Sequence, residues 1–192
     1  MKNIRSNIIA AGILCLSLGM TSCTKGFLDV ESKTESTTGN FYKTEQDAYR
    51  ALLGCYDGYR RATCGSAVNF LVSAEVMGYE CFGGSGASDG NGMRVTDRFD
   101  LSEMPSSTGS SWSGYYAGIY RCNELITREN SIQWNETGSM HTQYMAECHA
   151  IRAFLYFDVV RQFGNIPLLT KPTDENIPQA DPADVYKLIF DD

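Results

Sequence analysis

The longest run of periodic apolar positions lies between residues 144 and 163. Apolar side chains recur there at steps of three and four residues, which places them along one side of an α-helix: Tyr144, Met145, Cys148, Ile151, Phe154, Leu155 and Val159. We expect Phe154 to be buried between helices. Gly164 and Pro167 predict the end of this helix, because glycine accepts a left-handed conformation and proline cannot continue a helix. A short extended apolar segment, residues 166–169, is expected to follow.

Three more helices are predicted before this one. Residues 44–61 repeat apolar positions with a helical period, and Thr44 with Asp47 resembles a capping box at the start. Residues 66–77 indicate a second, shorter helix. The charge of Arg152, on the long helix, is expected to be paired or to reach solvent, because a lone buried guanidinium is too costly.

Residues 111–129 are predicted to form the helix that directly precedes the one at 144–163. An alternation of four- and three-residue steps is typical of a seam between packed helices, and it joins Trp112, Tyr116, Ile119, Asn123 and Ile126. Asn123 should therefore be buried and hydrogen-bonded. The short polar link 131–138 predicts an antiparallel hairpin with the helix at 144–163, which is the unit of tetratricopeptide-like arrays. The predicted fold class is mainly all-α, with helical hairpins and long irregular loops.

A last helix is expected to begin at Asp181, which can cap it, followed by Pro182 at the first helical position. The sequence stops at Asp192 about three turns later, without a C-cap signal. We therefore expect an N-terminal part of a larger fold, with residues 44–192 forming an incomplete helical domain.

Residues 78–111 break the periodicity and contain a glycine-rich run at 83–92. The run lacks the lysine and hydroxyl residue of a phosphate-binding loop. Long irregular loops inside a compact domain are often functional. Aromatic, charged and amide side chains in this loop could together stack on and hydrogen-bond a ligand, and we predict as binding residues Tyr79, Glu80, Phe82, Asp89, Asn91, Arg94 and Asp97.

The N-terminal segment is typical of a secretory leader. Lys2 and Arg5 precede an apolar run at residues 8–20, which is too short to span a bilayer. The residues before Cys23 resemble a bacterial lipobox, although a plain signal peptide with a nearby cysteine stays an alternative. We expect a lipoprotein signal peptide over 1–22, an acylated Cys23 and a tether over 23–43.

Composition narrows the function classes. The formal net charge of −7 argues against a nucleic-acid partner, because phosphate binding requires a basic face. No nucleophile elbow is present, and His141 and His149 are eight residues apart, which does not suit a shared metal on one helix. The sequence predicts no catalytic residues, no metal site and no cofactor.

The cysteines show no C-x-x-C pair, so no zinc site is predicted. A disulfide Cys55–Cys64 or Cys64–Cys81 stays open. Cys55, Cys122 and Cys148 lie among apolar helix positions and are most simply interpreted as small core residues.

Several motifs resemble the SusD/RagB family of nutrient-binding outer-membrane lipoproteins. The similar residues are Arg152-Ala153-Phe154, Tyr156-Phe157, Arg161 to Gly164, Pro167-Leu168, the Phe41-Tyr42-x-Thr44-x-x-Asp47-Ala48 start and the Trp112 to Ile126 seam. The resemblance implies a lipid-anchored outer-membrane protein that faces the cell surface. It would capture a glycan and deliver it to a SusC-like TonB-dependent transporter, without catalysis. It also implies ligand contacts partly in the loops before the Trp112 helix.

Three alternatives remain at this point. A peptide-binding member of the same family would use the same fold, and a helical-repeat scaffold would bind no small ligand. A glycan-cleaving enzyme would need catalytic residues beyond Asp192, and it is the least favoured.

Overall fold

The computed structural model describes residues 41–64, 69–84, 86, 88–89, 91–100, 102, 104–135 and 138–192. The predicted signal peptide, Cys23 and nearly all of the tether lie outside these residues. The described elements are α2 (Glu45–Cys64), α3 (Phe70–Met77), α4 (Asn91–Asp97), α5 (Met104–Arg128), the 3-10 turn η1 (Glu129–Ser131), α6 (Ser139–Phe163), β1 (Ile166–Pro167), β2 (Gln179–Ala180) and α7 (Pro182–Asp191).

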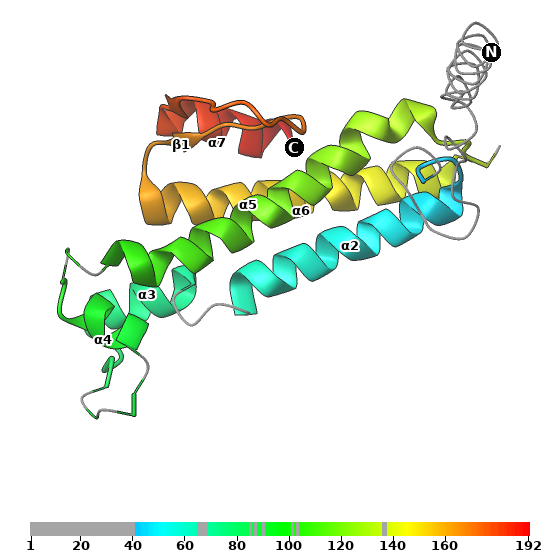
Figure 1. Cartoon of the computed structure of the whole chain (residues 1–192). Coiled ribbons are helices and arrows are strands. Elements are labelled where there is room, and N and C mark those ends of the chain that lie inside the picture. Colours follow the sequence, from blue (N-terminus) through cyan, green and yellow to red (C-terminus); the bar gives the residue numbers. More distant parts are fainter. Residues whose placement is uncertain are drawn as a thin grey trace, which may run out of the picture. The chain divides into compact units, whose positions relative to one another are not determined.

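Helices α2, α5 and α6 lie side by side and contact one another (Figure 1). α3 and α4 pack near the beginning of α5, and α7 packs on α6. β1 and β2 form a two-stranded antiparallel pair in which Ile166 lies opposite Ala180. This arrangement confirms the predicted mainly helical fold class. Of the helices that the structure describes, none combines the length and apolarity that a membrane crossing needs.

Local hydrogen bonds explain where several helices begin and end. At the start of α2, Asp47 N donates to Thr44 Oγ1 (3.2 Å) and Thr44 N donates to Asp47 Oδ2 (3.1 Å), which confirms the capping box. The side chain of Asp181 accepts a hydrogen bond from Ala183 N (2.8 Å) and caps α7 as predicted. Gly164 ends α6 with a φ of 72°, as expected for a glycine after the last turn.

Other boundaries differ from prediction. α3 begins at Phe70 rather than at residue 66, because Asn69 caps it by accepting a hydrogen bond from Val72 N (3.0 Å). α5 begins at Met104, earlier than the predicted residue 111, and α4 lies inside the segment predicted to be irregular. The start of α5 lacks an apolar period, but Ser111 is fully buried and its hydroxyl donates to Gln162 on α6 (3.4 Å). α5 also packs against α4, a helix that the sequence did not predict.

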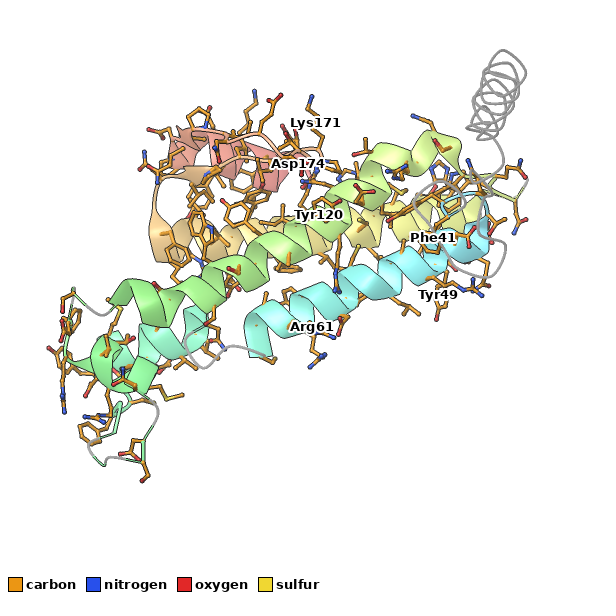
Figure 2. All side chains as sticks on the ribbon, in the orientation of Figure 1. Phe41, Tyr49, Arg61, Tyr120, Lys171 and Asp174 are labelled. Carbon is orange, nitrogen blue, oxygen red and sulfur yellow. The ribbon has the colours of Figure 1, made fainter. Side chains whose placement is uncertain are left out.

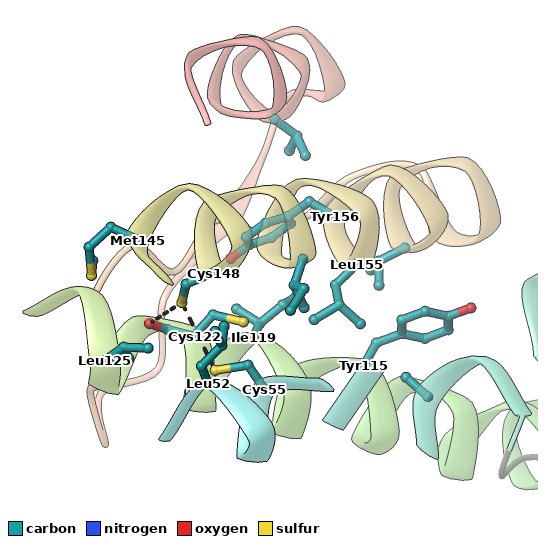
Figure 3. Packing of buried hydrophobic residues seen from close by; sticks show 14 of the residues in the cluster. Leu52, Cys55, Tyr115, Ile119, Cys122, Leu125, Met145, Cys148, Leu155 and Tyr156 are labelled. Atoms are coloured by element: carbon teal, nitrogen blue, oxygen red, sulfur yellow. Dashed lines mark hydrogen bonds between the residues drawn. The ribbon is translucent and has the colours of Figure 1, made fainter. Parts of the chain in front are cut away.

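The core lies where α2, α5 and α6 meet, and Figure 3 shows its packing. Its largest fully buried apolar side chains include Tyr115, Ile119, Leu125, Leu155 and Tyr156. α2 and α5 approach closely through two glycines, since a Cβ atom added to Gly58 would lie only 2.9 Å from Gly118 Cα. This small-residue contact sets how α2 crosses α5.

The prediction that Phe154 is buried is wrong. Phe154 is 59% exposed, whereas its neighbour Leu155 is 0% exposed. Successive residues on an α-helix are about 100° apart, so the two side chains point in different directions. The buried seam of α6 is centred on Cys148, Leu155 and Val159. Phe154 lies at the edge of that seam, where its ring is 6.3 Å from the ring of Tyr59 on α2.

The expectation for Asn123 is confirmed. Its side chain is 1% exposed; Nδ2 donates to Leu169 O (2.8 Å) and Oδ1 accepts from Arg152 Nη1 (2.8 Å). The charge of Arg152 is paired as expected, since Arg152 Nε donates to Asp192 Oδ2 (2.7 Å). His149 Nδ1 lies 2.7 Å from the other oxygen of the same carboxylate. A buried polar network therefore connects α5, α6 and the end of α7.

The cysteines of the described residues are free thiols, so neither of the two disulfides left open by the sequence is formed. Cys64 and Cys81 are exposed. Cys55, Cys122 and Cys148 are 0% exposed, which confirms that they are core residues.

Candidate functional site

The predicted binding segment lies at the end of the three-helix unit where α5 begins, around α3 and α4 (Figure 1). Tyr79 and Glu80 follow α3 after its C-cap Gly78, and Phe82 comes shortly after them. Asn91, Arg94 and Asp97 belong to α4. The structure therefore places the predicted residues on one short stretch of loop and helix.

An exposed aromatic pair is the most distinctive feature of this region. The rings of Tyr79 and Phe99 have centroids 6.3 Å apart, and the two side chains are 80% and 41% exposed. Both residues have positive φ angles, 62° and 53°. A bulky residue in this region costs on the order of 1–3 kcal/mol, and such strain gathers at functional sites. The pair offers a strained, solvent-facing apolar platform.

Phe99 is not among the binding residues predicted from the sequence, the last of which is Asp97. The available signal was an aromatic residue only two positions beyond that limit. What brings it to Tyr79 is the turn after α4, in which Phe99 N donates to Thr96 O (3.1 Å) and Asp100 N donates to Val95 O (3.1 Å). No local pattern in the sequence predicts that turn.

Polar groups lie in the same stretch. Arg94 Nη1 donates to Gly86 O (3.4 Å), and Asp89 Oδ2 accepts from Gly86 N (2.6 Å). The backbone approaches α4 closely here, because a Cβ atom on Gly83 would lie 2.5 Å from Asp97 Cβ. Arg94 Nε is buried and has no hydrogen-bond partner within the described part of the chain. Because this nitrogen is buried, it is the Nη1 end of the Arg94 side chain that contacts the glycine-rich loop, through Gly86 O.

The other predicted residues are arranged less closely. Glu80, Phe82 and Asn91 are all exposed, and the side chain of Phe82 is 74% exposed. Among the described residues, the ring contacts of this region join Tyr79 to Phe99 and do not include Phe82. The contacts thus join Tyr79 to Phe99, and join Arg94 and Asp89 to Gly86. Glu80, Phe82 and Asn91 are exposed in the same stretch of chain.

Two apolar grooves lie elsewhere. One, of about 370 Å³, is formed by α6 and α7 and lined by Ala150, Ala153, Phe154, Phe157, Ile189 and Asp192. A second, of about 200 Å³, lies between α2 and α6 and is lined by Tyr56, Tyr59, Glu147, Ala150, Ile151 and Phe154. The first groove is lined mainly by apolar side chains, whereas the second also includes two tyrosines and Glu147.

The chain is similar to known proteins along its whole length. It is 27% identical to a SusD-like protein of Formosa agariphila, over 100% of this chain and 37% of that relative. A second SusD-like protein of the same organism is 24% identical over 76% of this chain and 28% of that protein. The chain therefore spans about a third of the length of these relatives.

Solved structures agree in fold. A laminarin-binding SusD-like protein has a TM-score of 0.64 and 35% identity, over 77% of this chain and 32% of that chain. A SusD homologue from Bacteroides thetaiotaomicron has a TM-score of 0.60 and 26% identity, over 84% of this chain and 31% of that chain.

The family model described as starch-binding and associating with the outer membrane matches residues 87–192, which is more than half of this chain. The matched range includes α4, the seam helix α5, the long helix α6 and α7. Of the motifs that carried the resemblance in the sequence, those on α5 and α6 and at Pro167-Leu168 fall within it, and the motif that starts at Phe41 precedes it. The chain belongs to the SusD-like family.

Proposed function

We propose that this chain is part of an outer-membrane surface lipoprotein that binds a nutrient glycan and delivers it to a SusC-like TonB-dependent transporter. The observation that carries the proposal is the strained, exposed Tyr79–Phe99 pair, which flanks in sequence the helix that carries Arg94 and Asp97. Membership of a family described as starch-binding, and similarity to a laminarin-binding protein, support a glycan as the ligand. The protein would bind without catalysis and without a cofactor.

The chemistry of the site suits a sugar. A pyranose ring presents flat C–H faces, which pack on aromatic rings, and hydroxyl groups, which pair with carboxylates and guanidinium groups. The guanidinium group of Arg94 supplies donors, and the carboxylates of Asp97 and Asp89 supply acceptors. Each such hydrogen bond contributes on the order of 1 kcal/mol net. Affinity should therefore be modest, roughly micromolar to millimolar, which allows rapid release to a transporter.

Replacing Tyr79 and Phe99 with alanine should weaken glycan binding about tenfold or more, because the stacking platform is lost while the fold is retained. Tenfold corresponds to about 1.4 kcal/mol of binding free energy. Calorimetry with the glycan that supports growth measures the effect.

The matched control is Tyr120→Ala. Tyr120 is 52% exposed on α5, and Figure 2 shows it toward the segment that carries Lys171 and Asp174, away from the beginning of α5. Its removal should leave the affinity unchanged. If the wild type, the Tyr79 and Phe99 double variant and Tyr120→Ala all bind the glycan with equal affinity, the ligand site lies outside this loop. Binding of a peptide in place of the glycan would favour the peptide-binding alternative.

We also propose the domain organisation inferred from the sequence: a signal peptide over 1–22, an acylated Cys23, a tether over 23–43 and the helical domain over 44–192. The described compact unit, which begins at Phe41, is compatible with that last boundary. Each buried acyl CH₂ contributes roughly 0.8 kcal/mol, so two or more chains give a stable membrane anchor.

Cys23→Ala should abolish incorporation of labelled palmitate and leave the protein in the soluble fraction or as unprocessed precursor. Metabolic labelling followed by membrane fractionation tests this. Cys15→Ala is the matched control, since Cys15 lies within the predicted apolar run and should not be needed for labelling. Equal labelling of wild type and Cys23→Ala would rule out the lipid anchor at Cys23.

A further inference from the structure

Three cysteine side chains from three different helices converge in the core. Cys55 belongs to α2, Cys122 to α5 and Cys148 to α6. Their sulfur atoms all lie within 4.8 Å of one another, and Cys55 Sγ is 3.9 Å from Cys148 Sγ. Figure 3 shows the three side chains pointing toward a common point between the helices, among Leu52, Ile119 and Leu125. All three cysteines are 0% exposed.

The size of this triangle matches that of a metal site. A thiolate sulfur binds a metal such as zinc at about 2.3 Å, so three sulfurs around one ion in a plane are √3 times that distance apart, about 4.0 Å. The observed 3.9 Å between two of the sulfurs agrees with this spacing. The third sulfur lies within 4.8 Å of both, so a small rotation of one side chain closes the triangle.

The number and kind of ligands select the ion. Zinc in proteins requires four ligands, whereas the group found among the described residues consists of three thiols and no histidine or carboxylate. Soft thiolate ligands without oxygen or nitrogen donors favour Cu(I). The surroundings are apolar and the cysteines are fully buried, so water does not provide a further ligand. An unhydrated trigonal site of sulfur ligands suits a soft monovalent cation.

A loaded site carries an electrostatic cost. Three thiolates and one monovalent cation carry a net charge of −2, which is unfavourable in an apolar core. The guanidinium groups of Arg121 and Arg152 are already paired, with Asp57 (3.0 Å) and Asp192 (2.7 Å). The three sulfur–copper bonds must therefore outweigh this cost.

We propose that Cys55, Cys122 and Cys148 form a trigonal three-thiolate site for one Cu(I) ion. On binding, three sulfur–copper bonds form, the three S–H protons leave to solvent, and no atom changes oxidation state. The ion would then link α2, α5 and α6, so that loading stabilises the fold, because only the folded chain assembles the ligands. This site is independent of the proposed glycan site.

The test uses the full chain with Cys15, Cys23, Cys64 and Cys81 replaced by serine, so that the core thiols are the only thiols. The reduced protein is titrated anaerobically with Cu(I), supplied as its acetonitrile complex, in competition with a chromophoric Cu(I) chelator. One equivalent should bind tightly, the thermal midpoint should rise, and X-ray absorption should show three sulfurs at about 2.3 Å. Zn(II) at the same concentration should not compete.

Cys148→Ala in the same background removes one ligand and should weaken Cu(I) binding by at least a hundredfold. Circular dichroism shows whether Cys148→Ala is folded. If this variant is unfolded, the X-ray absorption spectrum of the four-serine background protein still gives the number of sulfur ligands around copper. The unmodified chain should bind the same single tight equivalent. Unchanged affinity in Cys148→Ala, fewer than three sulfurs around copper, or no tight equivalent in the background protein would each overturn the proposal.

Discussion

Replacing Arg152 with methionine should destabilise the chain by about 3–5 kcal/mol, the cost of removing one partner from a buried ion pair. The side chain of Arg152 is 5% exposed and that of Asp192 is 3% exposed. Without Arg152, the buried Asp192 carboxylate would lose an ion-pair partner that water could not replace. Asn123 Oδ1 would lose its donor as well. A urea titration followed by circular dichroism gives the change in the free energy of unfolding.

A matched control for this variant is Arg50→Met on α2. The Arg50 side chain is 62% exposed, and its nitrogen lies 3.8 Å from Asp47 Oδ1. Exposed pairs contribute about 0–1 kcal/mol, so this variant should unfold almost like the wild type. Similar free energies of unfolding for both variants would show that the Arg152 network does not stabilise the fold.

The ion pair of Arg152 and Asp192 should also make the free energy of unfolding depend on acid pH. Burial raises the pKa of the Asp192 carboxyl, but hydrogen bonds from Arg152 and His149 outweigh it, so the pKa is lowered overall. Because the pKa of Asp192 is lower in the folded state, its ionised carboxylate stabilises the fold at pH values above its pKa in the unfolded chain, about 3.9. This stabilisation is lost as the pH falls through the pKa of the folded state. The stability difference between wild type and Arg152→Met should therefore shrink below about pH 4.

Leu155→Ala should cost about 2–5 kcal/mol, whereas Phe154→Ala should cost less than about 1 kcal/mol. Leu155 is fully buried, and it packs so closely on α5 that a Cβ atom on Gly118 would lie 2.9 Å from Leu155 Cδ1. Phe154 has the larger ring but is 59% exposed, so its removal leaves no enclosed cavity. Denaturant titration of the two single variants compares them directly.

The comparison is controlled, because Phe154 and Leu155 are consecutive residues of α6 and both are replaced by alanine in the same helical backbone. A larger loss for Phe154→Ala than for Leu155→Ala would mean that the seam of α6 has been assigned to the wrong face. The result therefore tests the rotation of α6 against α2 and α5, which the apolar pattern did not fix.

The sequence by itself predicted what depends on short-range hydrogen bonding. Thr44 with Asp47 starts α2, Asp181 with Pro182 starts α7 and Gly164 ends α6, because each of these signals acts within a few residues. The regular stripe that contains Asn123 also showed that this amide would be buried. The motifs on these same helices were sufficient to indicate the family.

The tertiary structure decided which side chains meet. Contacts across helices depend on how each helix is rotated and how closely the helices approach, and the Gly58–Gly118 contact sets that approach for α2 and α5. A periodic pattern marks an apolar side only to within a residue or two, so it could not separate Phe154 from Leu155. The assembled fold also brings Phe99 beside Tyr79, and Cys55 beside Cys122 and Cys148. No local sequence pattern predicts these contacts, because the residues that meet come from different segments of the chain.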